Sequence, residues 1–209
     1  SRMKVSSTSP TRLSIFGGGS DLPTFSDKYG GLVLNMAINL YQRIEFSTLG
    51  GESTLPMFAS PTFYTTILKE MGLNPSEISL NAKFDGIIEA GLGSSASAAV
   101  ALVGIADKVK DLRMSKEQIA EKAWDIEVNK LGLYGGKQDQ YAAALGGVNF
   151  LEFKTDGEVK ITPLSPSFID PILPALILFY TGENRKSPVS QAGFRKLTSE
   201  QVEMLEKMK

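Results

Sequence analysis

Residues 90–100, AGLGSSASAAV, combine the residue types that bind phosphate groups through the backbone. Gly91 and Gly93 allow a sharp turn and a close approach to a ligand, and Ser94 and Ser95 can cap a helix or offer a hydroxyl. The N–H groups at the start of a helix carry partial positive charge, which stabilises anions. The stretch lacks the Lys-Ser/Thr pair of the common phosphate loop and the third glycine of the dinucleotide fingerprint. By itself it predicts either a phosphate-binding turn or an ordinary helix start.

The chain of 209 residues has no histidine and no cysteine, which narrows its possible chemistry. Thiolate nucleophiles, disulfides and cysteine metal sites are excluded, and the commonest general base is missing. Proton transfer would have to use Asp, Glu, Lys or Tyr. A bound metal would be a hard cation held by oxygen atoms, which favours Mg²⁺ over Zn²⁺.

The overall composition is ordinary for a globular protein, with 42% hydrophobic residues, 22% charged residues and a net charge of -1. This balance gives no electrostatic reason to expect a nucleic acid or an anionic membrane as partner. The longest apolar run, around residues 172–179, is interrupted by Pro174 and is too short to cross a bilayer. We therefore expect neither a nucleic-acid partner nor a membrane partner.

The elements that would position the glycine loop follow from hydrophobic periodicity. Strands are expected at 11–16, 30–48 (one strand or two), 76–86, 148–153, 159–164 and, buried, at 174–182. Helices are expected at 61–72, from the loop to about residue 110, at 115–132, at 137–147 and from 198 to the end. Ser115–Gln118 and Thr198–Gln201 have the spacing of a capping box. Strands and helices grouped in blocks favour an α+β fold over a doubly wound sheet.

Three widely spaced segments carry a resemblance to a known family. They are SPTRLSIFGGGSD (9–21), GLGSSAS (91–97) and GGKQDQYAAALGG (135–147). In this order they resemble the GHMP small-molecule kinases, over about residues 9–182. Within that family, FGGGSDLPTFSDKYGG, VLNMAINLY, GKQDQYAAALGGVNFLEF and LFYTG resemble the heptose 7-phosphate kinase branch.

The resemblance implies a GHMP kinase fold of two α+β domains, with ATP and substrate in the cleft between them. The N-terminal, ATP-binding domain would be like the second domain of ribosomal protein S5 and would span residues 3–168. Residues 169–209 would begin the α+β C-terminal domain. The last helix has no C-cap glycine, which predicts that this second domain is truncated here.

The resemblance also implies how ATP and Mg²⁺ would be held. The phosphate-binding residues would be Gly91, Leu92, Gly93, Ser94, Ser95 and Ala96. The Mg²⁺ ligands would be Glu127 and a loop hydroxyl, from Ser94 or Ser95. Asp125 is a nearby rival to Glu127, and an exposed helix glutamate is the alternative interpretation.

The remaining site residues are implied for the sugar and for catalysis. Asp139 would accept the proton of the attacking hydroxyl or orient that hydroxyl, and Arg12 beside it would stabilise charge on the transferring phosphoryl group. The substrate-binding residues would be Gly18, Gly19, Asp21, Lys137, Gln138 and Arg185. Lys137 and Arg185 are candidates for a substrate phosphate, although either could equally be a solvated surface charge.

The implied activity is transfer of the γ-phosphoryl group of ATP to the anomeric hydroxyl of D-glycero-D-manno-heptose 7-phosphate, in the cytoplasm. The product would be the 1,7-bisphosphate, a precursor for surface polysaccharide. The alternatives are a kinase for another sugar, of the fucose or galactose type, and a catalytically silent nucleotide-binding relative. An S5-like RNA-binding domain is disfavoured by the near-neutral charge. The sequence does not determine the oligomeric state.

Overall fold

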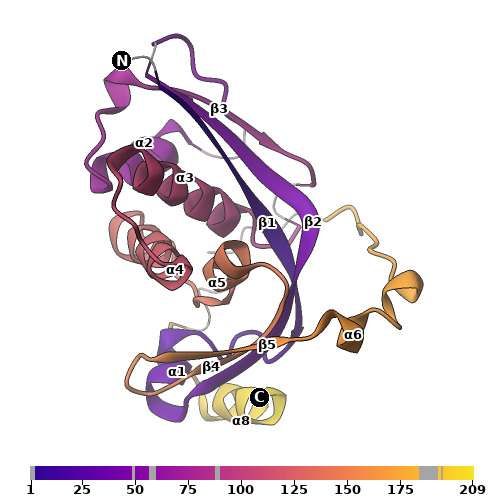
Figure 1. The fold of residues 1–209 in the computed structure, drawn as a ribbon. Helices are drawn as coiled ribbons and strands as arrows, with labels where there is room; N and C mark the ends of the chain where they lie inside the picture. The colour runs from indigo at the N-terminus through magenta and orange to yellow at the C-terminus, as the bar shows by residue number, and fades with distance from the viewer. Residues whose placement is uncertain (1–2, 49, 57–59, 88–89, 184–192, 194) are drawn as a thin grey trace.

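The structure is a computed structural model that describes all residues except 1–2, 49, 57–59, 88–89, 184–192 and 194 (Figure 1). Its five strands are β1 Lys4–Phe16, β2 Gly31–Ser47, β3 Ser79–Phe84, β4 Val148–Phe153 and β5 Val159–Leu164. The helices are α1 Pro23–Tyr29, α2 Pro61–Glu70, α3 Ser94–Lys110, α4 Lys116–Asp125, α5 Gln138–Leu145, α6 Pro166–Ile169 and α8 Ser199–Met208. Short helical turns are η1 Pro75–Glu77, η2 Ile126–Lys130 and η3 Leu173–Ala175.

The long strand β2 organises a single antiparallel sheet. Strand β1 pairs with one edge of β2 over almost its whole length. The other edge of β2 pairs with β4 through residues 31–36 and with β3 through residues 42–47. Strand β5 then pairs with β4 in the expected hairpin. The segment 30–48 therefore forms one continuous strand, and not two, and this strand pairs with β1, β3 and β4.

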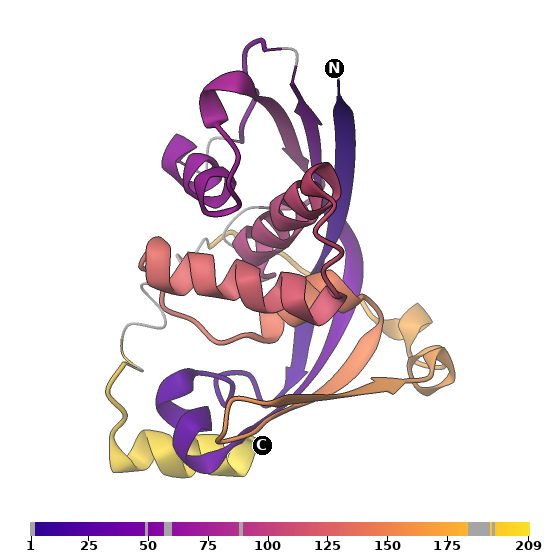
Figure 2. The same ribbon diagram turned by 60° about the vertical axis from the view of Figure 1, so that its left-hand side comes forward.

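Helices α2, α3, α4 and α5 lie on one face of the sheet (Figures 1 and 2). Helix α3 lies against β1 and β2, with α2 and α4 beside it, and α5 packs against β1 and α3. The first turns of α3 are rich in alanine, and Ala96, Ala98 and Ala99 are at most 2% exposed. These small side chains let the helix that follows the glycine loop lie deep in the fold.

The part of the sheet near β4 is covered on both faces. Val33 and Leu151 pack towards Tyr141 on the helical side. Leu34 packs with Ile169 in a separate cluster that also contains Met36 and Val148. Since both faces are buried, the apolar residues of β2 here are nearly continuous and do not alternate with polar ones.

Most of the expected elements are present. Both capping boxes form with their two reciprocal hydrogen bonds, Ser115–Gln118 at α4 and Thr198–Gln201 at α8. The predicted helix 115–132 changes at Ile126 into the π-helical turn η2. No helix among the described residues is long and apolar enough to span a membrane.

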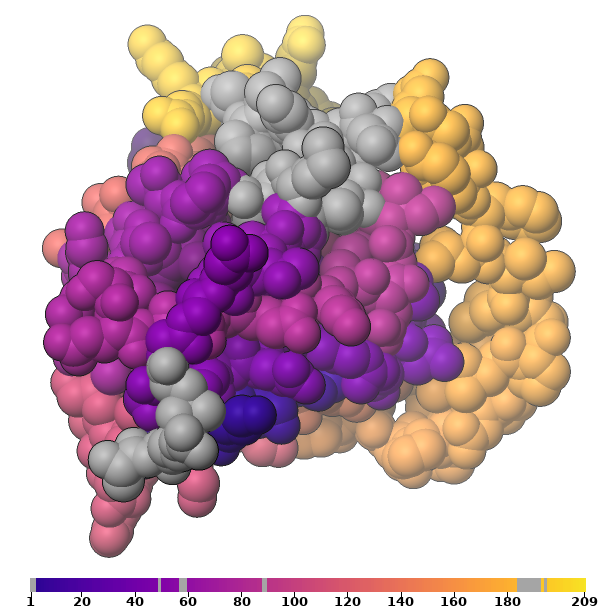
Figure 3. Space-filling view, turned by 90° about the horizontal axis from the view of Figure 1, so that it is seen from above, coloured from indigo at the N-terminus to yellow at the C-terminus, as the bar shows by residue number. Residues whose placement is uncertain are grey.

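The expectation of a buried strand at 174–182 is wrong. Within the described chain this segment joins no strand ladder, and it begins in the turn η3. Its apolar side chains are exposed, with Ile177 at 73% and Phe179 at 80%. In Figure 3 the orange segment after β5 arches away from the body of the molecule. Apolar composition alone does not make a strand, because a strand also needs a neighbouring edge for its backbone hydrogen bonds.

Candidate active site

The glycine loop turns directly into helix α3. Gly93 is the N-cap, with a left-handed φ of 71°, and within the described chain no side chain caps the helix. Ser94 and Ser95 are therefore the first two residues of the helix, and the expectation that one of them caps it is wrong. The N–H groups of the first turn remain for a ligand, which is the arrangement that binds phosphate.

Gly93 also makes room for a carboxylate. A Cβ atom built on Gly93 would lie 3.0 Å from Cγ and Oδ2 of Asp139. Any side chain here would press on that carboxylate and would also have to adopt a positive φ. The loop and the start of α5 can therefore meet this closely only because residue 93 is glycine.

Arg12 of β1 joins the loop to Asp139. Its Nε donates to Oδ1 of Asp139 over 2.7 Å, and its Nη1 donates to the carbonyl oxygen of Gly91 over 2.6 Å. Its backbone N–H donates to the carbonyl of Leu92 over 3.0 Å. One arginine thus fixes the position of the aspartate relative to the loop. The structure brings together the arginine, the aspartate and the glycines that the sequence analysis singled out from three distant segments.

Glu127 lies in the π-helical turn η2 and contacts the first turn of α3. It is 4% exposed, and its Oε2 accepts a hydrogen bond of 3.3 Å from the Ser95 hydroxyl. Gln140 donates to the other oxygen, Oε1, over 3.0 Å. The rival Asp125 accepts instead from Asn129 of its own helical segment. Of the two acidic candidates, only Glu127 is hydrogen-bonded to the loop.

Burial raises the pKa of Glu127 from 4.5 to about 7. The negative charge of Asp139 acts in the same direction, while the hydrogen bonds from Gln140 and Ser95 oppose the shift. A cation beside this carboxylate would favour its ionised form. The environment of Glu127 is therefore one in which a bound cation and the ionised carboxylate stabilise each other.

The oxygen atoms of Ser95 and Glu127 fit a small hard cation. Adjacent ligands in an octahedral Mg²⁺ shell, with bonds of about 2.0–2.1 Å, are roughly 3 Å apart. The Ser95 Oγ and Glu127 Oε2 atoms are 3.3 Å apart. Among the described residues no group of three or more His, Cys, Asp or Glu could hold a metal ion. A metal at Glu127 would therefore need oxygens from Ser95, from water and from a nucleotide.

Ser94 is the other candidate for the hydroxyl ligand. Its carbonyl oxygen accepts a hydrogen bond from Gln42, and no described contact links its hydroxyl to Glu127.

Asp21 lies in the turn that joins the glycine triplet to α1, and its carboxylate reaches the start of α5. It is 3% exposed, and its two oxygens accept 3.1 Å hydrogen bonds from the backbone N–H groups of Gly19 and Gln138. Burial raises the pKa of Asp21 above its usual value, against the effect of these two hydrogen bonds. A Cβ on Gly136 would overlap its carboxylate. Asp21 therefore ties the glycine triplet to α5, whatever further role its remaining lone pairs have.

Gln138 and Gly18 lie next to each other in this region. A Cβ on Gly18 would be 3.4 Å from Nε2 of Gln138. Gln138 is 7% exposed, and its Oε1 has no hydrogen-bond partner within the part of the chain that the structure describes. The predicted sugar-binding residues Gly18, Gly19, Asp21 and Gln138 thus form one connected group.

Lys137 has a protein partner that the sequence analysis missed. Its ammonium group pairs with Glu121 at 2.8 Å and lies 4.7 Å from the centre of the Trp124 ring. Tyr141 donates to the same Glu121 over 2.6 Å. The role of Lys137 as a phosphate ligand stays a prediction, and the observed contacts give it a structural role. Arg185 lies outside the described residues.

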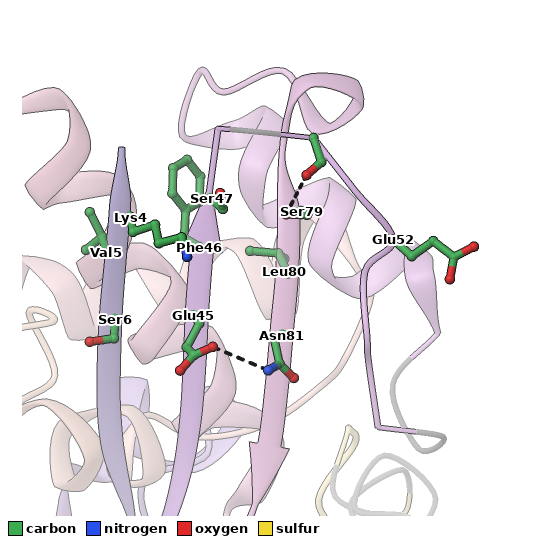
Figure 4. A pocket seen from close by; sticks show the side chains of 11 residues that line it. Lys4, Val5, Ser6, Glu45, Phe46, Ser47, Glu52, Ser79, Leu80 and Asn81 are labelled. Carbon is green, nitrogen blue, oxygen red and sulfur yellow. Dashed lines mark hydrogen bonds between the residues drawn. The ribbon is translucent and has the colours of Figure 1, made fainter. Parts of the chain in front are cut away.

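A separate groove of about 490 Å³ is found at the far end of the sheet (Figure 4). Its lining includes Lys4 and Ser6 of β1, Glu45 of β2, and Asn81 of β3. Glu45 and Asn81 are joined by a hydrogen bond of 3.3 Å. None of the predicted site residues lines this groove, so it is distinct from the loop region.

Comparisons with known proteins agree with this arrangement. Residues 62–147 match the family model described as GHMP kinases N terminal domain. The D-glycero-alpha-D-manno-heptose 7-phosphate kinase of Campylobacter jejuni is 33% identical over 184 residues, which cover 77% of this chain and 54% of that protein. A mevalonate kinase of Pyrococcus abyssi is 36% identical over 119 residues, 57% of this chain and 32% of that protein.

A solved structure shows the same fold. The crystal structure of a D-glycero-D-manno-heptose 1-phosphate kinase from Bacteroides thetaiotaomicron matches with a TM-score of 0.72 at 29% identity, covering 82% of this chain and 63% of that chain. The chain spans about half the length of the curated heptose kinase that it matches. The expected α+β class and GHMP kinase fold are confirmed. This chain therefore contains a domain of the GHMP kinase N-terminal family.

Proposed function

We propose that the protein is an ATP-dependent kinase of heptose phosphates, which transfers the γ-phosphoryl group to the anomeric hydroxyl of D-glycero-D-manno-heptose 7-phosphate. The observation that carries this proposal is the contact of the Arg12–Asp139 pair with the glycine loop. It places a carboxylate and a guanidinium beside a helix start that suits a triphosphate. The names of the two heptose kinases to which the chain is similar support a heptose phosphate as substrate.

In the proposed reaction the backbone N–H groups at the start of α3, in residues 91–96, hold the ATP phosphates. The anomeric oxygen of the sugar forms a bond to the γ-phosphorus, the bond from that phosphorus to the bridging oxygen breaks, and ADP leaves. Asp139 orients the attacking hydroxyl and accepts its proton. Arg12 holds Asp139 in place and stabilises the charge that develops on the transferring group.

Glu127 and Ser95 are the proposed ligands of a Mg²⁺ ion that accompanies ATP. When bound, such an ion would neutralise part of the charge of the ATP phosphates. The fit rests on the burial of Glu127 and on its hydrogen bond to Ser95. Ser94 has no such contact among the described atoms, so we assign the hydroxyl ligand to Ser95.

Asp21, with Gly18, Gly19 and Gln138, is the proposed sugar site. Each carboxylate oxygen has a second lone pair, so Asp21 can accept sugar hydroxyls in addition to its two backbone donors. The proposed division into an ATP-binding domain at 3–168 and a second domain from residue 169 is supported by the position of β5, the last strand of the sheet. We further propose that the protein acts in the cytoplasm, where ATP is available.

The test is ADP release by the full-length protein with a panel of acceptors. The panel contains heptose 7-phosphate, heptose 1-phosphate, unphosphorylated heptose, galactose, fucose and mevalonate. We expect the highest kcat/KM with heptose 7-phosphate. A preference for an unphosphorylated sugar would select another sugar kinase, and activity on mevalonate alone would overturn the sugar assignment. Nucleotide binding with no turnover on any acceptor would indicate a silent relative.

A further inference from the structure

Gln140 is a buried residue of the candidate active site, and the sequence motifs assign it no role. It follows Asp139 in α5 and is 5% exposed. Its Nε2 donates to Oε1 of Glu127 over 3.0 Å. Its own Oε1 is buried without a hydrogen-bond partner among the described atoms. Other buried amide oxygens in the described chain also lack a partner, and this one belongs to the side chain that donates to Glu127. A ligand or its water could supply the hydrogen bond that a buried polar atom usually has.

Gln140 and Ser95 together fix the orientation of the Glu127 carboxylate. Gln140 donates to Oε1, and Ser95 donates to Oε2. Each carboxylate oxygen therefore has one protein donor, and the two donors come from different helices. Oε2 is thus bonded to the first turn of α3, and Oε1 is bonded to α5.

Gln140 also links Glu127 to the proposed catalytic residue. Successive residues of an α-helix point about 100° apart, because there are 3.6 residues per turn. Asp139 accordingly contacts Arg12 and lies against Gly93, while Gln140 contacts Glu127. One turn of α5 thus contributes Asp139 itself and the side chain that holds the Glu127 carboxylate.

We propose that Gln140 is a positioning residue for the Mg²⁺-nucleotide. Its amide N–H groups hold Glu127 with one oxygen directed to the cation, and its unpaired carbonyl oxygen accepts a hydrogen bond from a water molecule of the hydrated cation. Mg²⁺ keeps several of its waters in protein sites, so it brings donors that the free protein lacks. The inference rests on one part of the proposed function, which is that the site binds a magnesium nucleotide. It does not depend on the identity of the sugar.

The test is ADP binding to the full-length protein by calorimetry, with Mg²⁺ and with EDTA, in the absence of any sugar. Gln140→Met keeps the approximate size of the side chain and removes both hydrogen-bonding groups. Loss of a residue that orients a metal ligand commonly lowers metal affinity about 10–100-fold. We therefore expect Q140M to weaken ADP binding in Mg²⁺ by about tenfold or more and to leave binding in EDTA within about twofold of wild type.

The matched control is Gln118→Met, which breaks the exposed capping box of α4 and leaves Glu127 untouched. It should lower the melting temperature and retain the full effect of Mg²⁺. If Q140M does not fold, Gln140→Asn retains a buried amide that is too short to reach Glu127, and the same loss of the Mg²⁺ effect is expected.

Three results would overturn the inference. One is a variant at position 140 that keeps the Mg²⁺ effect. Another is a variant that loses affinity equally in EDTA. The third is a wild-type protein whose ADP affinity does not respond to Mg²⁺. Because no sugar is present, a failure of heptose 7-phosphate as acceptor would contradict the proposed function and leave this result intact.

Discussion

The Nε atom of Arg12 donates to Oδ1 of Asp139 over 2.7 Å, although the two residues are 127 positions apart in the chain. The side chains are 13% and 25% exposed, so the pair is partly shielded and still accessible to a substrate. Arg12 uses a second donor on the carbonyl of Gly91. The arginine therefore sets the distance between the proposed phosphate loop and the proposed catalytic carboxylate.

Asp139→Asn should retain nucleotide binding and lower kcat by roughly a hundredfold or more, because the amide cannot accept the proton of the attacking hydroxyl. Calorimetry with ADP and a steady-state assay measure the two effects separately. Asp156→Asn, in the hairpin turn between β4 and β5, is the control and should be nearly neutral. Turnover of D139N close to that of wild type would remove Asp139 from the mechanism.

Gly93→Ala should lower the free energy of unfolding only moderately and should remove most of the kcat. The positive φ alone costs about 1–2 kcal/mol for an alanine, and the added methyl group would also press on the Asp139 carboxylate. Gly132→Ala is the matched control, since Gly132 has a similar φ of 68° and no described atom within 4 Å of a Cβ there. Both variants should unfold at similarly reduced urea concentrations, and only G93A should lose most of its kcat. Equal kcat values for the two variants would mean that the contact with Asp139 has no catalytic importance.

Glu127→Gln should change how stability depends on pH in the absence of metal. The pKa of Glu127 is raised from 4.5 to about 7 in the folded protein, so the folded state binds the proton more tightly than the unfolded state. Its contribution to stability is therefore complete below about pH 4.5 and is lost as the pH rises to about 7. At about 1.4 kcal/mol per pKa unit, the loss over the whole interval is at most roughly 3–4 kcal/mol.

Urea unfolding in EDTA at pH 5 and pH 7.5 measures this effect as the difference between wild type and E127Q. We expect wild type to lose stability over this interval relative to the variant. The same pH dependence in both proteins would show that the environment of Glu127 does not favour its protonated form.

Lys137→Met tests whether this lysine binds a substrate phosphate or serves the fold. Because Lys137 pairs with Glu121 and lies over the Trp124 ring, we expect the variant to be destabilised by about 1 kcal/mol, with an unchanged KM for the sugar phosphate. The measurement is KM for heptose 7-phosphate together with a urea unfolding curve. Glu121→Gln, which removes the charge of the partner, should have a similar effect on stability. A KM raised tenfold in K137M alone would restore the phosphate-binding role.

The resemblance of the ordered motifs to the GHMP kinases implied the glycine loop, the closeness of Arg12 to Asp139 and an acidic residue at position 127. Local spacing alone could not have shown the Arg12–Asp139 contact, because the two residues are 127 positions apart. The loop geometry at Gly93 was less predictable. Glycine and serine both favour helix starts, and the contact with Asp139, which a larger residue would disturb, is visible only in three dimensions. The hydrogen bonds of Gln140 and Lys137 depend on how α4 and η2 pack against α5, which local sequence does not encode.

The segment 174–182 shows that a sequence pattern can also predict an element that the structure does not contain. Its composition is typical of a buried strand, and the prediction of a strand rests on this hydrophobic pattern alone. In the structure Ile177 and Phe179 are exposed, and the described part of the segment pairs with no strand. Burial depends on what lies opposite a segment, and periodicity describes only the segment itself.

The most direct test of the proposed function is the chemical identity of the product. The full-length protein is incubated with ATP, Mg²⁺ and D-glycero-D-manno-heptose 7-phosphate, and the product is followed by ³¹P NMR, with D139N in parallel. The account predicts a new phosphate signal coupled to the anomeric proton and retention of the 7-phosphate signal, with D139N forming this product roughly a hundredfold or more slowly. A phosphate transferred to another hydroxyl, or the same product formed at an equal rate by D139N, would contradict it.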